Sequence, residues 1–403
     1  MSGLGACGKS EGTDVPDELQ SWSRTEVLGH EDVALYDRIA VASDGRRTAW
    51  LTRAGGATDI LGVAEWSTAD GASPRQSDLE MPKGDRPNDL VVPAAMAVDE
   101  RGWIAVAQLE DEPGGRSAEV AVWAGAPATP GPPATLELPD GHVLARPVAA
   151  ARTDEVAVVV ALTGPAPETP GLPAPTDLVL WTAPVSGADG TVDEGTWLQV
   201  RPYLGTDLPL TSAAVIGGAG DAGLVLAGAS ADGVAGMWTS SDGLSWDPLA
   251  AAAELPEEVD ALDLLAPLGD GTALVGWATG GSSGTVELWR LDGSDLTALG
   301  TVVAASDEGI IDLTGAAVAG DRLVVGGSTK RRSTWSPMLW AVEADGDAES
   351  EWTASDQPEL IAHLDWSVQA LAADGADRMT AVMASVPFHI DIAAWSWSRP
   401  VGS

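Results

Sequence analysis

Seven apolar runs along the chain end at or beside a tryptophan, and apolar and polar positions tend to alternate within each run. The tryptophans are Trp66, Trp123, Trp181, Trp238, Trp289, Trp340 and Trp395. They follow one another at intervals of roughly 50 to 60 residues, which is a repeat length typical of propellers. Alternation with a period of two is typical of a β-strand that buries one face. The pattern therefore predicts seven equivalent strands.

Two further strands are predicted ahead of each tryptophan run. In the sixth unit, the apolar stretch 316–319 is followed by the turn pair Gly320-Asp321 and then by the apolar stretch 323–325. A short segment after the tryptophan predicts a fourth strand. No part of the sequence sustains the 3.6-residue period of a long helix. Each unit thus predicts four antiparallel strands joined by turns rich in Gly, Asp and Pro.

A self-similar unit of this length with four strands is typical of a β-propeller blade. We expect an all-β chain: a seven-bladed β-propeller of four-stranded antiparallel blades over residues 20–403, after a flexible N-terminal tether over residues 1–19. Too few residues follow Trp395 to complete the last blade, whereas residues 21–28 resemble the fourth-strand segment 196–200. We expect this N-terminal strand to pair beside the last tryptophan strand and close the ring, which removes an exposed sheet edge.

Residues 238–246 carry the one detailed motif. They read Trp-Thr-Ser-Ser-Asp-Gly-Leu-Ser-Trp, which resembles the Asp-box of sialidase-like propellers, Ser-x-Asp-x-Gly-x-Thr-Trp, with one residue fewer between Asp242 and Gly243. The resemblance implies a structural turn between third and fourth strands, in which Asp242 accepts backbone N–H bonds and Trp246 packs beneath. It does not imply catalysis. Sialidase activity would also require three clustered arginines and a tyrosine nucleophile, and neither Tyr36 nor Tyr203 lies in such a pattern.

The charge balance restricts the partners. Sixty acidic residues against 21 basic ones give a net charge of −39. Such a charge repels nucleic acid and anionic lipid, and it attracts cations or a basic partner. We therefore expect no nucleic-acid binding and no direct contact with lipid head groups.

The single cysteine, Cys7, lies in Leu4-Gly5-Ala6-Cys7, a string that resembles the lipobox of bacterial lipoproteins. The resemblance implies lipidation of Cys7 and a location outside the cell or on its surface, with membrane contact only through the lipid. The charged start and apolar stretch of a signal peptide do not precede it in this sequence. The alternative is an incidental cysteine in a flexible N-terminus.

Acidic residues recur where the first strand of several units begins. They are Asp37, Asp260, Asp263, Asp312 and Asp365. Counting back from Gly320 and Ala373 gives Asp312 and Asp365 the same position in their units. We expect Asp260, Asp263, Asp312 and Asp365 to converge near the axis as candidate cation ligands, with Ca²⁺ the possible ion, because carboxylates held close bind cations or raise their pKa values. The alternative is that aspartate is simply common at strand starts. The four histidines show no metal-ligand spacing, and no other cofactor is indicated.

The run Lys330-Arg331-Arg332 stands out in so acidic a chain. It is a candidate partner-binding segment for an acidic group, or else a solvated hairpin tip.

Two functions follow. The first is a non-enzymatic cell-surface or extracellular propeller that binds a protein or glycan of the bacterial envelope. The alternative is an extracellular enzyme that acts on a glycan with a pair of axial carboxylates, which would have to lie about 5–9.5 Å apart. The sequence leaves the oligomeric state open.

Overall fold

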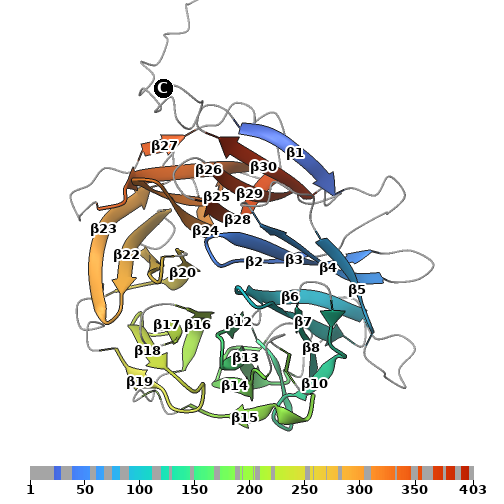
Figure 1. Cartoon of the computed structure of the whole chain (residues 1–403). Coiled ribbons are helices and arrows are strands. Elements are labelled where there is room, and N and C mark those ends of the chain that lie inside the picture. Colours follow the sequence, from blue (N-terminus) through green and yellow to red (C-terminus); the bar gives the residue numbers. More distant parts are fainter. Residues whose placement is uncertain are drawn as a thin grey trace, which may run out of the picture.

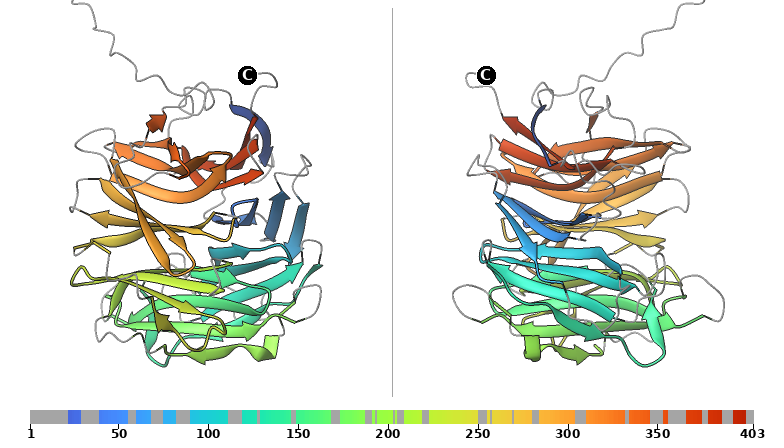
Figure 2. Two further views of the ribbon diagram at one scale, coloured as in Figure 1. Left: turned by 60° about the vertical axis from the view of Figure 1, so that its left-hand side comes forward. Right: turned by 90° about the vertical axis from the view of Figure 1, so that its right-hand side faces the viewer.

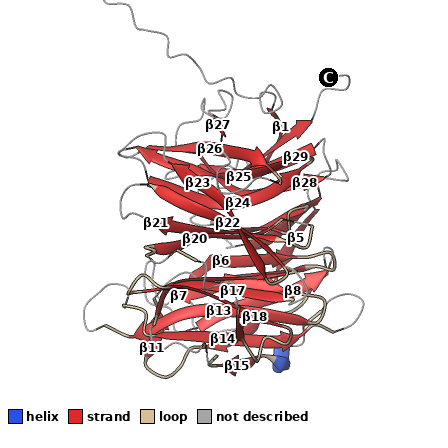
Figure 3. Cartoon of the chain, turned by 90° about the vertical axis from the view of Figure 1, so that its left-hand side faces the viewer, coloured by secondary structure: helices blue, strands red, loops and turns tan. Residues whose placement is uncertain are grey.

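The computed structural model describes 24 stretches of the chain. They are residues 22–28, 39–54, 60–67, 75–81, 90–110, 119–126, 129–145, 149–167, 173–186, 191–192, 194–202, 204, 209–218, 223–249, 255–256, 258–268, 270–279, 284–303, 310–331, 334–345, 353–355, 366–374, 378–385 and 392–398. Within these stretches the chain is built almost entirely of β-strands (Figure 3).

The strands form seven separate antiparallel sheets, which we number by the chain order of their first strands. Sheet 1 contains β2 (Ile39–Ser43), β3 (Arg47–Ala54), β4 (Ile60–Ser67) and β5 (Arg75–Leu79). Sheet 2 contains β6 (Leu90–Val98), β7 (Trp103–Glu110), β8 (Glu119–Ala126), β9 (Thr129–Pro130) and β10 (Ala134–Glu137). Sheet 3 contains β11 (His142–Leu144), β12 (Ala149–Arg152), β13 (Val156–Pro165), β14 (Asp177–Pro184) and β15 (Leu198–Val200), with the one-turn helix η2 (Glu194–Thr196) before β15.

The remaining sheets have four strands each. Sheet 4 contains β16 (Leu210–Gly217), β17 (Leu224–Ser230), β18 (Ala235–Ser240) and β19 (Asp247–Pro248). Sheet 5 contains β20 (Ala261–Pro267), β21 (Ala273–Thr279), β22 (Thr285–Asp292) and β23 (Asp295–Val303). Sheet 6 contains β24 (Ile310–Ala319), β25 (Arg322–Arg331), β26 (Thr334–Glu343) and β27 (Thr353–Ser355). Sheet 7 contains β28 (Trp366–Asp374), β29 (Arg378–Ser385), β30 (Ile392–Ser398) and β1 (Trp22–Leu28).

The expectation of an all-β chain of antiparallel sheets is confirmed; five sheets have the expected four strands, whereas sheets 2 and 3 have five. The seven tryptophans that mark the repeat lie in β4, β8, β14, β18, β22, β26 and β30, and each of these strands is third in its sheet. Strand β1 pairs with β30, so that Trp22 lies opposite Trp397 and Leu28 opposite Ile392. Figure 2 shows β1 in blue beside the red strands from the C-terminal end of the chain.

The first strands of the sheets contact one another in order. Strand β2 contacts β6, β6 contacts β12, β12 contacts β16, β16 contacts β20, β20 contacts β24, β24 contacts β28, and β28 contacts β2. Figure 1 shows these strands around a common centre, with the later strands of each sheet further out.

The core lies between neighbouring sheets rather than within any one of them. Trp103 and Trp123 are fully buried between sheets 1 and 2, Trp277 between sheets 4 and 5, and Trp340 between sheets 5 and 6. Successive side chains of a strand point to opposite faces of its sheet, and each face packs on a different neighbour. A single sheet therefore buries its apolar side chains only when both neighbours are present. No helix in the described part of the chain is long and apolar enough to cross a membrane.

Candidate functional site

Five of the first strands carry a β-bulge near their start. The extra residue is Ala94 in β6, Thr211 in β16, Asp263 in β20, Thr314 in β24 and Gln369 in β28. A bulge leaves one residue outside the regular pairing and turns its side chain in a new direction. We call the end of the sheets at which the first strands begin the starting face.

Side chains at three of these bulges bond the next sheet. Ser212 Oγ accepts a hydrogen bond from Leu262 N at 2.8 Å and joins sheet 4 to sheet 5. Asp263 Oδ2 accepts one from Leu313 N at 3.1 Å and joins sheet 5 to sheet 6. Thr314 Oγ1 donates one to Val368 O and joins sheet 6 to sheet 7. We call these three contacts the bulge bonds. They fasten consecutive sheets near the centre, at the starting face.

The second of these contacts brings two predicted residues together. Asp263 is half-buried, and its carboxyl bonds the backbone next to Asp312 on the neighbouring sheet. Burial is the main cause that raises the pKa of Asp263; the bond from Leu313 N lowers it and the negative charge of Asp312 raises it, so that the pKa is about 7. Loss of water contact also raises the pKa of Asp312, although the residue as a whole is exposed. Asp263 is the group of this pair that titrates near neutrality.

The other predicted acidic residues do not join this pair in the described part of the chain. Asp260 is exposed, and its N–H donates to Ala278 O at 2.8 Å. Asp37 and Asp365 lie outside the described residues. Among the described residues, no three His, Cys, Asp or Glu side chains lie close enough together to hold a metal ion. The cation site expected of Asp260, Asp263, Asp312 and Asp365 stays a prediction.

The bulges also correct one correspondence. Asp312 lies two residues before the bulge residue Thr314. The spacing to Gly320 and Ala373 predicts that Asp365 is the counterpart of Asp312. The residue two positions before Gln369 in β28 is instead Ser367.

The predicted basic segment lies at the same end of sheet 6 as Asp312. Lys330 pairs with Ile310, two residues before Asp312, and Arg331 pairs with Thr334 at the end of the β25–β26 hairpin. Arg332 lies outside the described residues. The end of β25, the start of β26 and the aspartate pair therefore share the starting face.

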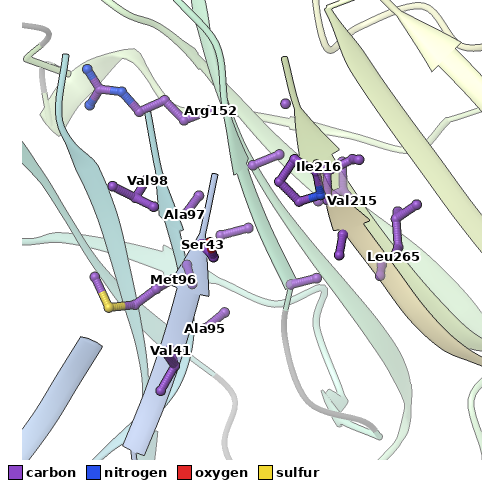
Figure 4. Close-up of a pocket in the computed structure, with 18 of the residues that line it drawn as sticks. Val41, Ser43, Ala95, Met96, Ala97, Val98, Arg152, Val215, Ile216 and Leu265 are labelled. Atoms are coloured by element: carbon purple, nitrogen blue, oxygen red, sulfur yellow. The ribbon is translucent and has the colours of Figure 1, made fainter. Parts of the chain in front are cut away.

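A cavity of about 270 Å³ lies between the first strands of sheets 1 to 6. Its walls are mostly small apolar side chains, such as Ala95, Ala97 and Val215 (Figure 4). Among the described residues that line it, Arg152 alone has an ionisable side chain. The walls therefore offer apolar contact and backbone edges rather than acid or base groups.

The Arg152 side chain makes its contacts within the protein. Its side chain is fully buried, and its Nε donates to Asp99 Oδ2 at 2.9 Å. Its Nη1 donates to Trp103 O at 3.4 Å, whereas its Nη2 is buried with no hydrogen-bond partner. Figure 4 shows the guanidinium turned toward the strand that carries Val98 and away from Val215 and Leu265. The side chain thus ties sheet 3 to sheet 2 instead of facing the cavity. Sequence reasoning missed this pair, because the two residues belong to different repeats and neither has a local motif.

The Asp-box-like turn has the structural form that the resemblance implies. Asp242 Oδ1 accepts hydrogen bonds from Leu244 N at 2.8 Å and from Ser245 N at 2.9 Å, and Trp246 is buried. The Ser245 bond is the largest of the effects that lower the pKa of Asp242. Gly243 has a φ of 70° and packs against Thr182 of sheet 3. The turn therefore holds sheet 4 against its neighbour.

Comparison with known proteins shows similarity of structure only. No protein-family model matches the sequence, and no curated protein matches it. The chain is similar to a chain in the crystal structure of a mitotic checkpoint complex, with a TM-score of 0.50, 11% identity and 99% of each chain covered. At this identity the likeness concerns the fold alone.

Two further solved structures are similar at lower scores. The phage phi92 endosialidase has a TM-score of 0.47 and 10% identity, with 95% of this chain and 70% of that chain covered. The β-propeller domain of the trilobed protease from Pyrococcus furiosus has a TM-score of 0.45 and 10% identity, with 90% and 96% covered. Scores below 0.5 carry no inference about activity.

Proposed function

We propose that this chain is a seven-bladed β-propeller, closed by its N-terminal strand, that binds a partner at the starting face. The observation that carries the binding proposal is the contact of Asp263 with Leu313 N, which sets two carboxyl groups from adjacent sheets beside each other at that face. A partner that brings a positive charge to this pair gains attraction and relieves the repulsion between the carboxylates. The net charge of −39 adds long-range attraction for the same kind of partner.

The partner class that fits best is a protein of the bacterial envelope with a basic segment; a glycan is the other candidate. The test is binding of purified envelope fractions to the full chain and to the double variant Asp263→Asn/Asp312→Asn. We expect at least a tenfold loss of affinity in this variant and none in Asp292→Asn/Asp295→Asn, which removes two exposed charges from the outer part of sheet 5. Equal binding by wild type and both variants would exclude the starting face as the binding surface.

The second candidate function is catalysis by the same carboxyl pair. A carboxyl group that titrates near pH 7, as Asp263 does, suits general acid or base work at neutral pH. Hydrolysis of chromogenic glycosides that disappears in Asp263→Asn would support an enzyme. Sialidase activity is a weaker proposal, because Tyr36 and Tyr203 fit no sialidase pattern in the sequence.

Ring closure is supported by the pairing of β1 with β30 and by the contact of β28 with β2. Removal of residues 1–19 should leave the melting temperature nearly unchanged, whereas removal of residues 1–29 deletes β1 and exposes the edge of β30. We expect the longer truncation to aggregate or to melt much lower. Equal melting temperatures for the two truncations would argue against closure by β1.

Attachment to the membrane through Cys7 is a separate proposal, and Cys7 lies outside the described residues. Mass spectrometry of the native protein should find a diacylglyceryl-modified Cys7 at a processed N-terminus. An unmodified, unprocessed N-terminus would remove both the anchor and the argument for a surface location.

A further inference from the structure

The three bulge bonds each join two consecutive sheets, but they use different chemical groups. In each, a side chain at or next to the bulge bonds a backbone group of the next first strand, one residue before that strand's own bulge residue. Ser212 and Thr314 do this with hydroxyl groups, which carry no charge. Asp263 does it with a carboxyl group. The contact between sheets 5 and 6 is thus the one bulge bond among the described residues that depends on an ionisable group.

The residue beside the donor, Leu313, makes this contact unusual. Leu313, which donates to Asp263, is preceded by Asp312 on the same strand. Deprotonation of both carboxyl groups places two like charges on opposite sides of the boundary between the sheets. Their repulsion works against the hydrogen bond that Asp263 makes. Among the described residues, Asp312 is the charged group with a resolved effect on the pKa of Asp263, and that effect raises the pKa.

We infer that repulsion between Asp263 and Asp312 weakens the boundary between sheets 5 and 6, which we call the joint. When both residues carry charge, the starting face opens first at this joint. The two negative charges favour separation of sheets 5 and 6, and the hydrogen bond from Leu313 N to Asp263 opposes this separation. The pKa of Asp263, raised toward neutrality, agrees with a carboxyl group that is costly to ionise at this position. The flanking contacts at Ser212 and Thr314 use neutral hydroxyl groups and involve no such repulsion.

The inference adds local opening to the proposed binding surface and does not depend on any partner. Opening would separate β20 from β24 at their starts and leave the buried tryptophan layer further out in place. Backbone amides that lose their bonds in a local opening exchange with solvent faster than those that open only on global unfolding. The joint is therefore measurable in the isolated full-length chain.

The test is hydrogen exchange by mass spectrometry at pH 8.5, which lies above the pKa of about 7 of Asp263. Peptides that cover residues 310–318 should exchange at least fivefold more slowly in Asp312→Asn than in the wild type. Sodium chloride at high concentration should slow the same peptides in the wild type, because it screens the repulsion, and should have little effect in Asp312→Asn. Peptides from Trp103–Glu110, in the core of sheet 2, should not change.

Two controls separate the joint from general charge effects. Asp295→Asn removes an exposed charge from β23 and should leave exchange at residues 310–318 unaltered. Asp263→Thr places at this contact the residue type that Thr314 provides at the next one, and it should slow exchange as Asp312→Asn does. If Asp312→Asn leaves the exchange of residues 310–318 unchanged or makes it faster, the pair does not load the boundary and the inference is wrong.

Discussion

Asp99 and Arg152 join sheets 2 and 3 through an ion pair in which Arg152 Nε lies 2.9 Å from Asp99 Oδ2. The arginine side chain is fully buried, whereas Asp99 retains partial contact with solvent. Asp99 Oδ1 also accepts bonds from Arg101 N and Gly102 N in the turn that follows β6. One carboxylate therefore shapes a turn and neutralises a buried charge on the adjacent sheet.

Removal of the carboxylate should be costly. Asp99→Ala leaves the guanidinium of Arg152 buried without its counter-ion, and loss of one partner of a buried pair costs about 3–5 kcal/mol. The double variant Asp99→Ala/Arg152→Met should recover a large part of this loss, because no unpaired charge remains. Guanidinium chloride denaturation of the three proteins measures the effect. Arg101→Met, which breaks the exposed pair with Asp154, should cost less than about 1 kcal/mol; an equal loss in both single variants would contradict the role given to Arg152.

Asp242→Ala should weaken the turn between β18 and β19. It removes the acceptor of the bonds from Leu244 N and Ser245 N, and we expect a loss of about 1–2 kcal/mol. The folded state lowers the pKa of Asp242 below its ordinary value of 3.8, so the stabilising contribution of this group is present above pH 3.8 and disappears as the pH falls through the lower folded value. Thermal melts of wild type and variant should therefore converge in strong acid. Asp232→Ala, at an exposed turn in the same sheet, is the matched control.

For Asp263 we expect the opposite dependence of folding stability on pH. Its folded pKa is raised from 3.8 to about 7, so the folded state binds this proton more tightly than the unfolded state does. The resulting stabilisation is complete below pH 3.8 and is lost as the pH rises to about 7. The melting temperature of the wild type, relative to Asp263→Asn, should fall across this window and then level off. Asp260→Asn, three residues earlier, should parallel the wild type, and a pH-independent difference between wild type and Asp263→Asn would contradict the raised pKa.

Gly217→Ala should be strongly destabilising. A Cβ at this position would lie 1.9 Å from the carbonyl oxygen of Arg152, and backbone of two neighbouring sheets would have to separate to make room. Overpacking of this kind typically costs about 1–3 kcal/mol or more. Gly195→Ala is the control, because a Cβ there meets no atom within 4 Å. Similar denaturation midpoints for the two variants would show that sheets 3 and 4 tolerate a wider separation.

Calcium should raise the melting temperature if the acidic residues of the starting face bind a cation. When the free calcium concentration is one hundred times the dissociation constant, binding stabilises the folded state by about 2.7 kcal/mol. Asp263→Asn/Asp312→Asn should abolish the increase. A shift no larger than that produced by sodium chloride of equal ionic strength would leave these carboxylates without a cation site.

The repeat was readable from the sequence because it rests on local pattern. The tryptophan runs and the Asp242 turn consist of residues close together in the chain, and alternation plus turn chemistry identifies them. The positions of the first-strand aspartates were not readable to the same degree. Strands β24 and β25 are separated by two residues, Gly320 and Asp321, whereas β28 ends at Asp374 and β29 begins at Arg378. Gly320 is the first residue after β24, whereas Ala373 still lies within β28, so counting back eight residues from each misaligns Asp312 and Asp365.

Contacts between repeats were beyond the reach of the pattern for a different reason. Asp263 lies at a bulge and bonds Leu313 of the next sheet, whereas Asp99 and Arg152 meet through the packing of sheets 2 and 3. A bulge changes the direction of one side chain without changing the apolar pattern around it. Acidic residues where several first strands begin gave a signal for Asp263, and it does not distinguish a bond between sheets from a solvated side chain.

The pairing of β1 with β30 has a consequence for synthesis on the ribosome. Leu28 is made before the strands of sheets 1 to 6, and its partner Ile392 is made after them. While those sheets are synthesised, β1 therefore lacks its partner β30. Unpaired strand edges in unfinished chains are prone to pair with the wrong partner. The nascent chain must therefore keep β1 available until β30 has been made.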